Sequence, residues 1–490
     1  MTPVKLSDIS RREFLSRSSL GCGSLALAHL VATQDARGAL PLPNFQPKVK
    51  RVIFLAMSGG PPHIDLFDEK PLLNELVGQE LPPEVRGGQR LTGMTANQGK
   101  LSLLPSLRPH RNYGESGMRM SEMLPHTGSI ADDITLIRSM YTEQINHSPA
   151  LTYLLTGHPI AGRPSIGAWA TYGLGAANEN LPSYVVLTSR DQQNSCGQLF
   201  YNHYWGSGFL PSRFQGVKFR GKGDPVLYLS NPQGVSRQQR KSSLNDLAEL
   251  NGLRHELYKD PEIETRIAQY EMAFRMQASV PELTDFDSEP AHVKELYGPD
   301  VERPGSFARN CLLARRLAER GSRFIQVMHS GWDHHRNINS QLEIQAKDTD
   351  QPSAALVKDL KQRGLLDDTL VIYGGEFGRT PFCQGDPNAA AFGRDHHNRG
   401  FSLWMAGGGL KGGYTHGHTD AYGYNLADAD GNVIKPDKHH YKEGAVHIHD
   451  LQATILDQMG IDHTALTYKY QGRRFRLTDV HGTVVKSLLA

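Results

Sequence analysis

The sequence lacks the features that mark disulfide scaffolds, nucleic-acid-binding proteins and membrane proteins. It has only four cysteines in 490 residues, too few for a disulfide framework. Its formal net charge is +2, and Lys and Arg are spread along the chain, so nucleic acid binding is not expected. Beyond the N-terminal region no run approaches the roughly 20 apolar residues that cross a bilayer. We therefore expect a mature protein with no membrane span.

The N-terminal region has the pattern of an export signal. Residues 10–16 read Ser-Arg-Arg-Glu-Phe-Leu-Ser, and residues 20–32 are weakly apolar and rich in Gly, Ala and Leu. Paired arginines followed by Phe-Leu match the twin-arginine signal; an ordinary basic helix is the alternative. We expect residues 1–39 to be the signal peptide and linker, and the protein to be exported in folded form to the periplasm or the outside. The sequence does not fix the oligomeric state.

Short apolar runs bounded by turn residues predict buried strands. They cover residues 51–57, 134–140, 184–188, 323–329, 369–373 and 401–406. Helical patterns lie between them, at residues 306–319, which Ser306 can cap, and at residues 354–363. This alternation predicts an α/β fold over residues 48–490, a three-layer α/β/α sandwich with a mostly parallel central sheet. Residues 68–121 and 189–302 carry few strand signals, which predicts insertions there, the second with helices at 244–257 and 263–276.

Acidic and imidazole side chains follow these strands. Asp333 and His335 lie two positions apart after one strand, so in extended backbone they point to the same side. His396, just before the strand at residues 401–406, would complete a set of two His and one Asp. Such a set suits zinc, manganese or iron better than calcium or magnesium. Because strand ends of an α/β sheet converge on one crevice, we predict a metal site here; hydrogen-bonded loop histidines are the alternative.

Two further segments supply candidates. His63 and Asp65 follow the first strand and its Gly59-Gly60 turn, and Asp65 with Glu376 could hold a second ion; structural acidic residues beside turns are the alternative. We therefore predict one or two divalent metal ions, with zinc or manganese favoured.

Another candidate segment reads Asn146-His147-Ser148-Pro149 at the start of a helical pattern. A hydroxyl there faces the positive end of the helix, where an anion binds and a nucleophile ionises more easily. Ser148 before a proline is equally an ordinary helix cap. Arg379, next to another of these loops, could clamp an oxyanion.

These motifs together resemble a family of exported bacterial proteins known as domain of unknown function 1501, placed near the alkaline phosphatase and sulfatase superfamily. The matching segments are Gly59-Gly60-Pro61 with His63 and Asp65, Asn146-His147-Ser148-Pro149, Gly331-Trp332-Asp333 with His335, Gly375-Glu376-Phe377-Gly378-Arg379-Thr380, and Gly393-Arg394-Asp395-His396. The resemblance covers essentially the whole chain. It implies an alkaline phosphatase-like fold and a metal-dependent hydrolase of phosphate or sulfate esters.

The chain departs from the superfamily at four places. Ser58 stands where its members have a metal-binding Asp, and Glu376-Phe377 where they have Asp-His or Asp-Asn. His147 stands where sulfatases have the residue that becomes formylglycine, and Leu151 stands where they have an Arg. The resemblance thus implies a phosphatase-like site without formylglycine, with one half represented by Asp333, His335 and His396 and the other half altered.

The favoured hypothesis is an exported hydrolase in which the metal polarises the ester and Ser148 or a water molecule attacks. His147 would assist proton transfer and Arg379 would hold the anion. Small-molecule or extracellular polysaccharide esters are the expected substrate class. The alternatives are a non-catalytic metal- or ligand-binding protein on the same fold and a structural cell-surface protein.

Overall fold

A computed structural model describes residues 43–490 except 191–197, 222–224, 227–229 and 436–443. The expected signal peptide, residues 1–39, lies outside the described residues. Among the described residues, no helix combines the length and the apolar character that a bilayer crossing requires. Cys311 and Cys383 are both buried and free.

A nine-stranded sheet forms the centre of the molecule, in the order β12-β4-β11-β8-β1-β7-β5-β6, with β15 also paired to β4. The strands are β1 (Arg51–Ser58), β4 (Ile134–Tyr141), β5 (Tyr184–Arg190), β6 (Val217–Phe219), β7 (Phe324–Ser330), β8 (Thr369–Gly374), β11 (Arg399–Ala406), β12 (Tyr414–His416) and β15 (Val446–His447). Every pairing is parallel except those of β11 with β4 and β8. The mostly parallel sheet and the six predicted strands are confirmed.

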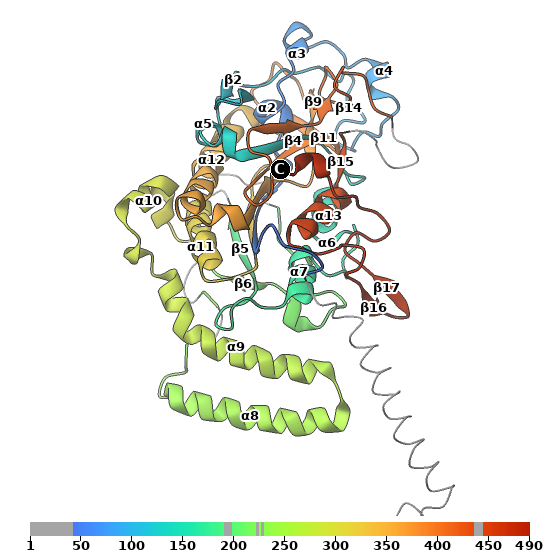
Figure 1. Cartoon of the computed structure of the whole chain (residues 1–490). Coiled ribbons are helices and arrows are strands. Elements are labelled where there is room, and N and C mark those ends of the chain that lie inside the picture. Colours follow the sequence, from blue (N-terminus) through green and yellow to red (C-terminus); the bar gives the residue numbers. More distant parts are fainter. Residues whose placement is uncertain (1–42, 191–197, 222–224, 227–229, 436–443) are drawn as a thin grey trace, which may run out of the picture.

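The central strand shows how the layers form. Successive side chains of a strand point to opposite faces, and all those of residues 52–57 are buried. Ile53, Leu55 and Met57 pack on the face covered by α11 (Phe307–Glu319) and α12 (Ile338–Gln362). The alternate residues, from Val52 to Ala56, pack on the face covered by α6 (His147–Thr156), α7 (Ile166–Leu174) and α13 (Ile448–Gln458). Figure 1 shows these two helical layers on either side of the strands, which confirms the three-layer sandwich.

The flanking helices begin where the sequence predicts in one case and not in the other. Ser306 caps α11, its hydroxyl accepting a hydrogen bond from the Arg309 N–H at 3.0 Å. Helix α12 starts at Ile338, sixteen residues before the predicted start at 354, and contains Pro352. The first half of this helix was not predicted, because the residues before Pro352 are mostly polar and a proline usually ends a helical pattern.

The two predicted insertions hold the remaining elements. The first carries α3 (Leu72–Glu75), α4 (Pro83–Arg86), β2 (His110–Tyr113) and β3 (Met118–Ser121), with α2 (His63–Leu66) just before and α5 (Pro125–Gly128) just after. The second carries α8 (Arg237–Tyr258), α9 (Pro261–Thr284) and α10 (Ala291–Tyr297), and also β6, which joins the sheet edge without having been predicted. Short strand pairs complete the fold: β9 (Gly378–Gln384) with β10 (Gly393–His397), β13 (His418–Thr419) with β14 (Leu426–Ala427), and β16 (Tyr468–Tyr470) with β17 (Arg473–Phe475).

The direction of β11 determines what lies at the functional edge. Because β11 is antiparallel to β8, with Leu403 opposite Gly374 and Ala406 opposite Val371, its first residues lie at the carboxyl end of β8. The β9–β10 hairpin connects β8 to β11 on this same side. Side chains before β11 can therefore meet side chains that follow β7 and β4.

Candidate metal centre at the carboxyl edge of the sheet

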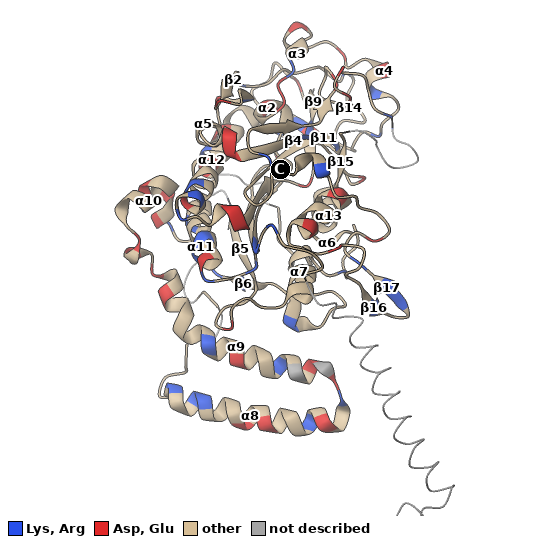
Figure 2. Ribbon diagram, viewed as in Figure 1, with Lys and Arg blue, Asp and Glu red and all other residues tan. Residues whose placement is uncertain are grey.

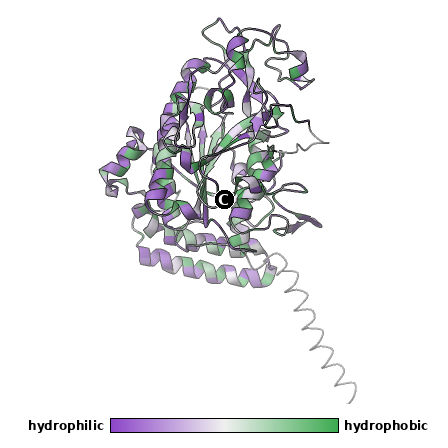
Figure 3. Ribbon diagram, turned by 45° about the horizontal axis from the view of Figure 1, so that its top comes forward, coloured by the Kyte–Doolittle hydropathy of each residue, from purple (hydrophilic) through white to green (hydrophobic). Residues whose placement is uncertain are grey.

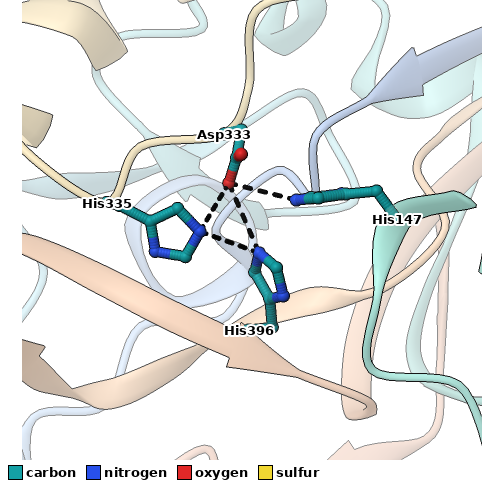
Figure 4. A group of neighbouring side chains, drawn as sticks. All are labelled: His147, Asp333, His335 and His396. Carbon is teal, nitrogen blue, oxygen red and sulfur yellow. Dashed lines mark hydrogen bonds and ion pairs between the residues drawn. The ribbon is translucent and has the colours of Figure 1, made fainter. Parts of the chain in front are cut away.

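Four side chains from three distant segments meet at this edge. They are His147 at the start of α6, Asp333 and His335 after β7, and His396 on β10, and one potential ligand atom of each lies within 4.8 Å of the others. Asp333 Oδ1 is at the centre, 3.1 Å from His147 Nε2, 2.9 Å from His335 Nε2 and 3.4 Å from His396 Nε2. Figure 4 shows the three imidazoles pointing toward this carboxylate.

The other nitrogen of each imidazole faces a hydrogen-bond acceptor. His147 Nδ1 lies 2.6 Å from Glu376 Oε1, His335 Nδ1 lies 2.6 Å from Gln384 Oε1, and His396 Nδ1 lies 2.8 Å from the Ile145 carbonyl oxygen. A carboxylate and a carbonyl only accept, so the Nδ1 atoms that face them carry the protons. In the neutral rings the Nε2 lone pairs are then directed into the cluster, as in histidines that ligate a metal and are oriented by outer partners.

This arrangement fits a cation. His335 Nε2 and His396 Nε2 lie 2.9 Å apart, and with protons on both Nδ1 atoms two lone pairs face each other. A positive charge between them removes that repulsion. Three imidazole nitrogens and one carboxylate oxygen match the ligand types of zinc, and imidazole also suits other transition metals.

Electrostatics favour the metal-binding protonation states of two ligands. Burial would raise the pKa of Asp333, but the hydrogen bonds that the imidazoles donate to it when Nε2 also carries a proton, together with the charge of Arg379, outweigh burial and hold the pKa far below its usual range. Burial lowers the pKa of His396 to about 4, although the hydrogen bond that the protonated ring would donate to Asp333 opposes the change. At neutral pH Asp333 is therefore ionised and His396 is neutral.

His147 has the opposite tendency. Burial lowers its pKa, but hydrogen bonds with Asp333 and Glu376 outweigh burial and raise the pKa above the usual value. A metal ion and a proton compete for His147 Nε2, so the raised pKa makes binding at this ligand depend on pH.

Arg379 lies behind Asp333. Its side chain is only 1% exposed, and it donates to Asp333 Oδ1 at 2.6 Å, to the Gly60 carbonyl oxygen at 3.0 Å and to the Arg394 carbonyl oxygen at 3.0 Å. The predicted role of Arg379 was to clamp a substrate anion. The structure instead places its guanidinium inside the protein, where it neutralises Asp333 and ties down the turn after β1.

Two other predicted metal ligands lie outside the cluster. Asp65 is fully buried and pairs with Arg394, with Nε to Oδ2 at 2.8 Å and Nη2 to Oδ1 at 3.1 Å, and the Leu107 N–H also donates to it at 3.0 Å. His63 Nε2 lies 2.9 Å from the Gly423 carbonyl oxygen, and burial lowers the pKa of this ring. Neither Asp65 nor Glu376 belongs to the one candidate group of three or more metal-binding side chains that the described residues hold.

Glu376 lies at the cluster but one step out. It is fully buried, and it accepts hydrogen bonds from the Gly59 N–H at 3.0 Å and from His147. In the structure it therefore orients the His147 ring and does not join the group whose atoms converge on Asp333.

The start of α6 presents a hydroxyl next to the cluster. The helix begins at His147 with Asn146 as its N-cap, so the alternative of Ser148 as the cap is wrong. Ser148 is exposed, and the Tyr204 hydroxyl donates to its Oγ at 3.5 Å. The first N–H groups of a helix have no partner within it, so the positive end of α6 lies next to the cluster.

The family model described as "Protein of unknown function (DUF1501)" matches residues 49–489. The chain belongs to this family. A comparison with curated proteins found no match.

Solved structures that are similar to this family member share little sequence with it. They include the lipoteichoic acid synthase LtaP from Listeria monocytogenes, with 9% identity, a TM-score of 0.35 and 91% of this chain and 79% of that chain covered. The sulfatase PsFucS1 from Pseudoalteromonas sp. has 12% identity and a TM-score of 0.34, with 93% of this chain and 79% of that chain covered. The phosphonate monoester hydrolase SpPMH from Silicibacter pomeroyi has 13% identity and a TM-score of 0.31, with 75% of this chain and 71% of that chain covered. TM-scores below 0.5 are too low to assign the activity of any of these structures to this DUF1501 protein.

Glycines let the loops of the centre approach one another. Gly59 has φ +117°, and a Cβ there would lie 2.6 Å from the Asp333 backbone nitrogen. A Cβ on Gly393 would lie 2.2 Å from the carbonyl carbon of His335. Side chains at either position would push apart the segments that carry Asp333, His335 and His396.

The sequence predicted that His147 lies near the site, but in a different role from the one the structure shows. It predicted proton transfer, whereas the structure makes His147 the fourth member of the group around Asp333. The available signal was its position shortly after the predicted strand at residues 134–140, the same kind of position that identified Asp333 and His335.

Proposed function

We propose that this protein is an exported metal-dependent hydrolase of phosphate or sulfate esters. The observation that supports it is the convergence of three imidazole Nε2 atoms and one carboxylate oxygen within 4.8 Å, with each imidazole fixed from behind by an acceptor. A divalent metal bound there would act as a Lewis acid on an ester oxygen. Export by the twin-arginine route fits the proposal, since that signal delivers folded protein.

The surrounding residues would bind and orient an anionic ester. The positive end of α6 would receive the ester oxygens through the N–H groups of His147 and Ser148. The exposed Ser148 hydroxyl is the candidate nucleophile, with water as the alternative. We assign His147 to the metal in place of proton transfer, and Arg379 to holding Asp333 ionised.

Metal analysis combined with ester assays tests the proposal. We expect about one zinc or manganese ion per chain and turnover of an aryl phosphate or an aryl sulfate. His335→Ala removes a ligand whose side chain is 15% exposed, so it should lose the metal and at least about 100-fold in turnover without unfolding the protein. His418→Ala is the control, because His418 is exposed and outside the cluster.

Two outcomes would contradict parts of this proposal. Full metal content in His335→Ala would contradict the proposal that His335 and its neighbours form the metal centre. Metal without turnover of any ester would favour the non-catalytic binding protein.

Ser148→Ala separates the two attacking groups. If the hydroxyl attacks, this variant keeps its metal and loses turnover. Unchanged turnover would assign the attack to water.

A further inference from the structure

Helices α8 and α9 form an antiparallel pair at the margin of the molecule, on the far side of α7 and α11 from the metal centre (Figures 1 and 3). No residue of the 22-residue helix α8 is buried. Its partly buried positions are residues 240, 244, 248, 251, 252 and 255, which recur with the spacing of one helix face. This face packs against α9, so the rest of the helix surface faces away from the protein.

The outer surface of α8 carries a stripe of leucines. Leu247, Leu250, Leu253 and Leu257 are 42%, 56%, 57% and 77% exposed. They recur every three or four residues, so they share one side of the helix, beside the face that packs on α9. A contiguous apolar stripe of this kind marks an interaction surface rather than scattered exposed residues.

The charges around the stripe are arranged for pairing with an identical helix. Asp246 and Arg254 lie four residues to either side of Leu250. Two copies of α8 that pair antiparallel about Leu250 place Asp246 of each copy level with Arg254 of the other. A parallel pairing would place Asp246 level with Asp246.

The ends of the helix also favour the antiparallel orientation. Arg237, Arg240 and Lys241 lie near its start, and Figure 2 shows basic residues gathered in the first turns. Antiparallel pairing keeps the basic starts of the two copies apart and also opposes the two helix dipoles.

We propose that the leucine stripe of α8 is the self-association surface through which two copies of this chain form a two-fold symmetric dimer. A two-fold interface uses the same patch on both copies and closes on itself. A helix of 22 residues is about 33 Å long, which gives all four leucines of each copy a place in the contact. A lipid surface fits less well, because α8 has four basic and three acidic residues, whereas helices that bind membrane surfaces are enriched in Lys and Arg.

Sedimentation analysis of the purified chain at about 1 to 100 μM tests the proposal. We expect a monomer–dimer equilibrium for the natural sequence. Leu250→Glu should weaken it about 30-fold or more, the size expected for a central apolar contact. Because Leu250 is 56% exposed, the variant should keep its unfolding midpoint. Asn245→Glu, on another exposed side of α8, is the matched control and should leave the equilibrium unchanged.

A charge exchange tests the antiparallel orientation. Asp246→Arg alone and Arg254→Asp alone should each weaken dimerisation, and the double variant should restore it. A monomer at every concentration overturns the proposal, as does a dimer that Leu250→Glu leaves intact. Binding of the monomer to anionic phospholipid vesicles that depends on Leu250 would assign the stripe to a membrane surface instead.

Discussion

Single residues of the same type take different roles in this protein because their partners differ. Asp333 and Asp65 are both buried carboxylates close to an arginine. Arg394 and the Leu107 N–H donate to both oxygens of Asp65, which does not belong to the group around Asp333. Asp333 has one oxygen shared among three imidazoles, and a cation there would join the four groups. Sequence spacing alone does not distinguish these two environments.

The role of Glu376 as a positioning residue leads to a first prediction. Glu376→Gln keeps the shape of the side chain but removes the charge that polarises the His147 ring, so metal affinity should fall about 10- to 100-fold. Competition with a chelator of known affinity measures this change. Glu143→Gln is the control, because Glu143 also pairs with a histidine but lies outside the metal centre. Its Oε2 atom is 3.0 Å from His447 Nε2. Equal effects of the two substitutions would contradict the role assigned to Glu376.

His449 gives a second prediction, on pH. Its ring is buried, Nε2 donates to the Gly157 carbonyl oxygen at 3.0 Å, and burial lowers its pKa to about 4. The unfolded chain takes up a proton near pH 6.5, while the folded chain resists protonation until about pH 4, so this group destabilises the protein as pH falls through that interval. The loss should reach on the order of 3 kcal/mol.

Urea unfolding at pH 7 and pH 4.5 measures the effect. The difference in unfolding free energy between the two pH values should be smaller in His449→Gln, which cannot titrate. The exposed His418, substituted in the same way, should leave the difference unchanged. An unchanged difference in His449→Gln would show that His449 does not resist protonation.

At the scale of elements, most of the sheet could be predicted and the direction of one strand could not. The six apolar runs identified their strands because buried parallel strands are continuously apolar. The same pattern does not report whether β11 runs with or against β8, and that direction decides whether His396 lies at the metal edge or at the opposite edge. Strand β6 escaped prediction because it has only three residues.

The candidate site divides in the same way. Asp333, His335 and His396 were predicted from strand ends and are brought together. The ring orientations of the imidazoles depend on partners such as Ile145 and Gln384, which come from segments far apart in the chain and carry no recognisable motif. Tertiary packing, and not local sequence, sets those contacts.

Close packing of the strand exits leads to a third prediction. In Gly59→Ala the new Cβ would meet the backbone of Trp332 and Asp333 at 2.6 to 2.9 Å, at a φ that disfavours any side chain. We expect a loss of about 3 kcal/mol or more in unfolding free energy, together with weaker metal binding. Gly78→Ala is the matched control, with φ +74° and open space around the added Cβ, and should cost about 1 kcal/mol. Similar losses in urea unfolding for both variants would show that backbone conformation alone matters at Gly59.

At the scale of the whole molecule, the metal centre joins segments that no local contact connects. His147 follows β4, Asp333 and His335 follow β7, and His396 precedes β11, so one ion would link both sides of the central strand β1. Such a ligand binds the folded state and not the unfolded chain, so it adds its binding free energy to stability.

Chelation should therefore lower the thermal unfolding midpoint of the natural sequence. An ion at about 1,000 times its Kd contributes about 4 kcal/mol, which corresponds to a fall of several degrees when the ion is removed. His335→Ala should unfold at the lower midpoint with or without chelator, because it has no complete site to lose. Calorimetry with and without chelator measures both proteins, and added zinc or manganese should restore only the natural one. A chelator effect of the same size in His335→Ala would place the stabilising ion elsewhere in the chain. If the chelator effect is absent in His335→Ala alone, the stability of the sandwich depends on an ion held by the group of four side chains centred on Asp333.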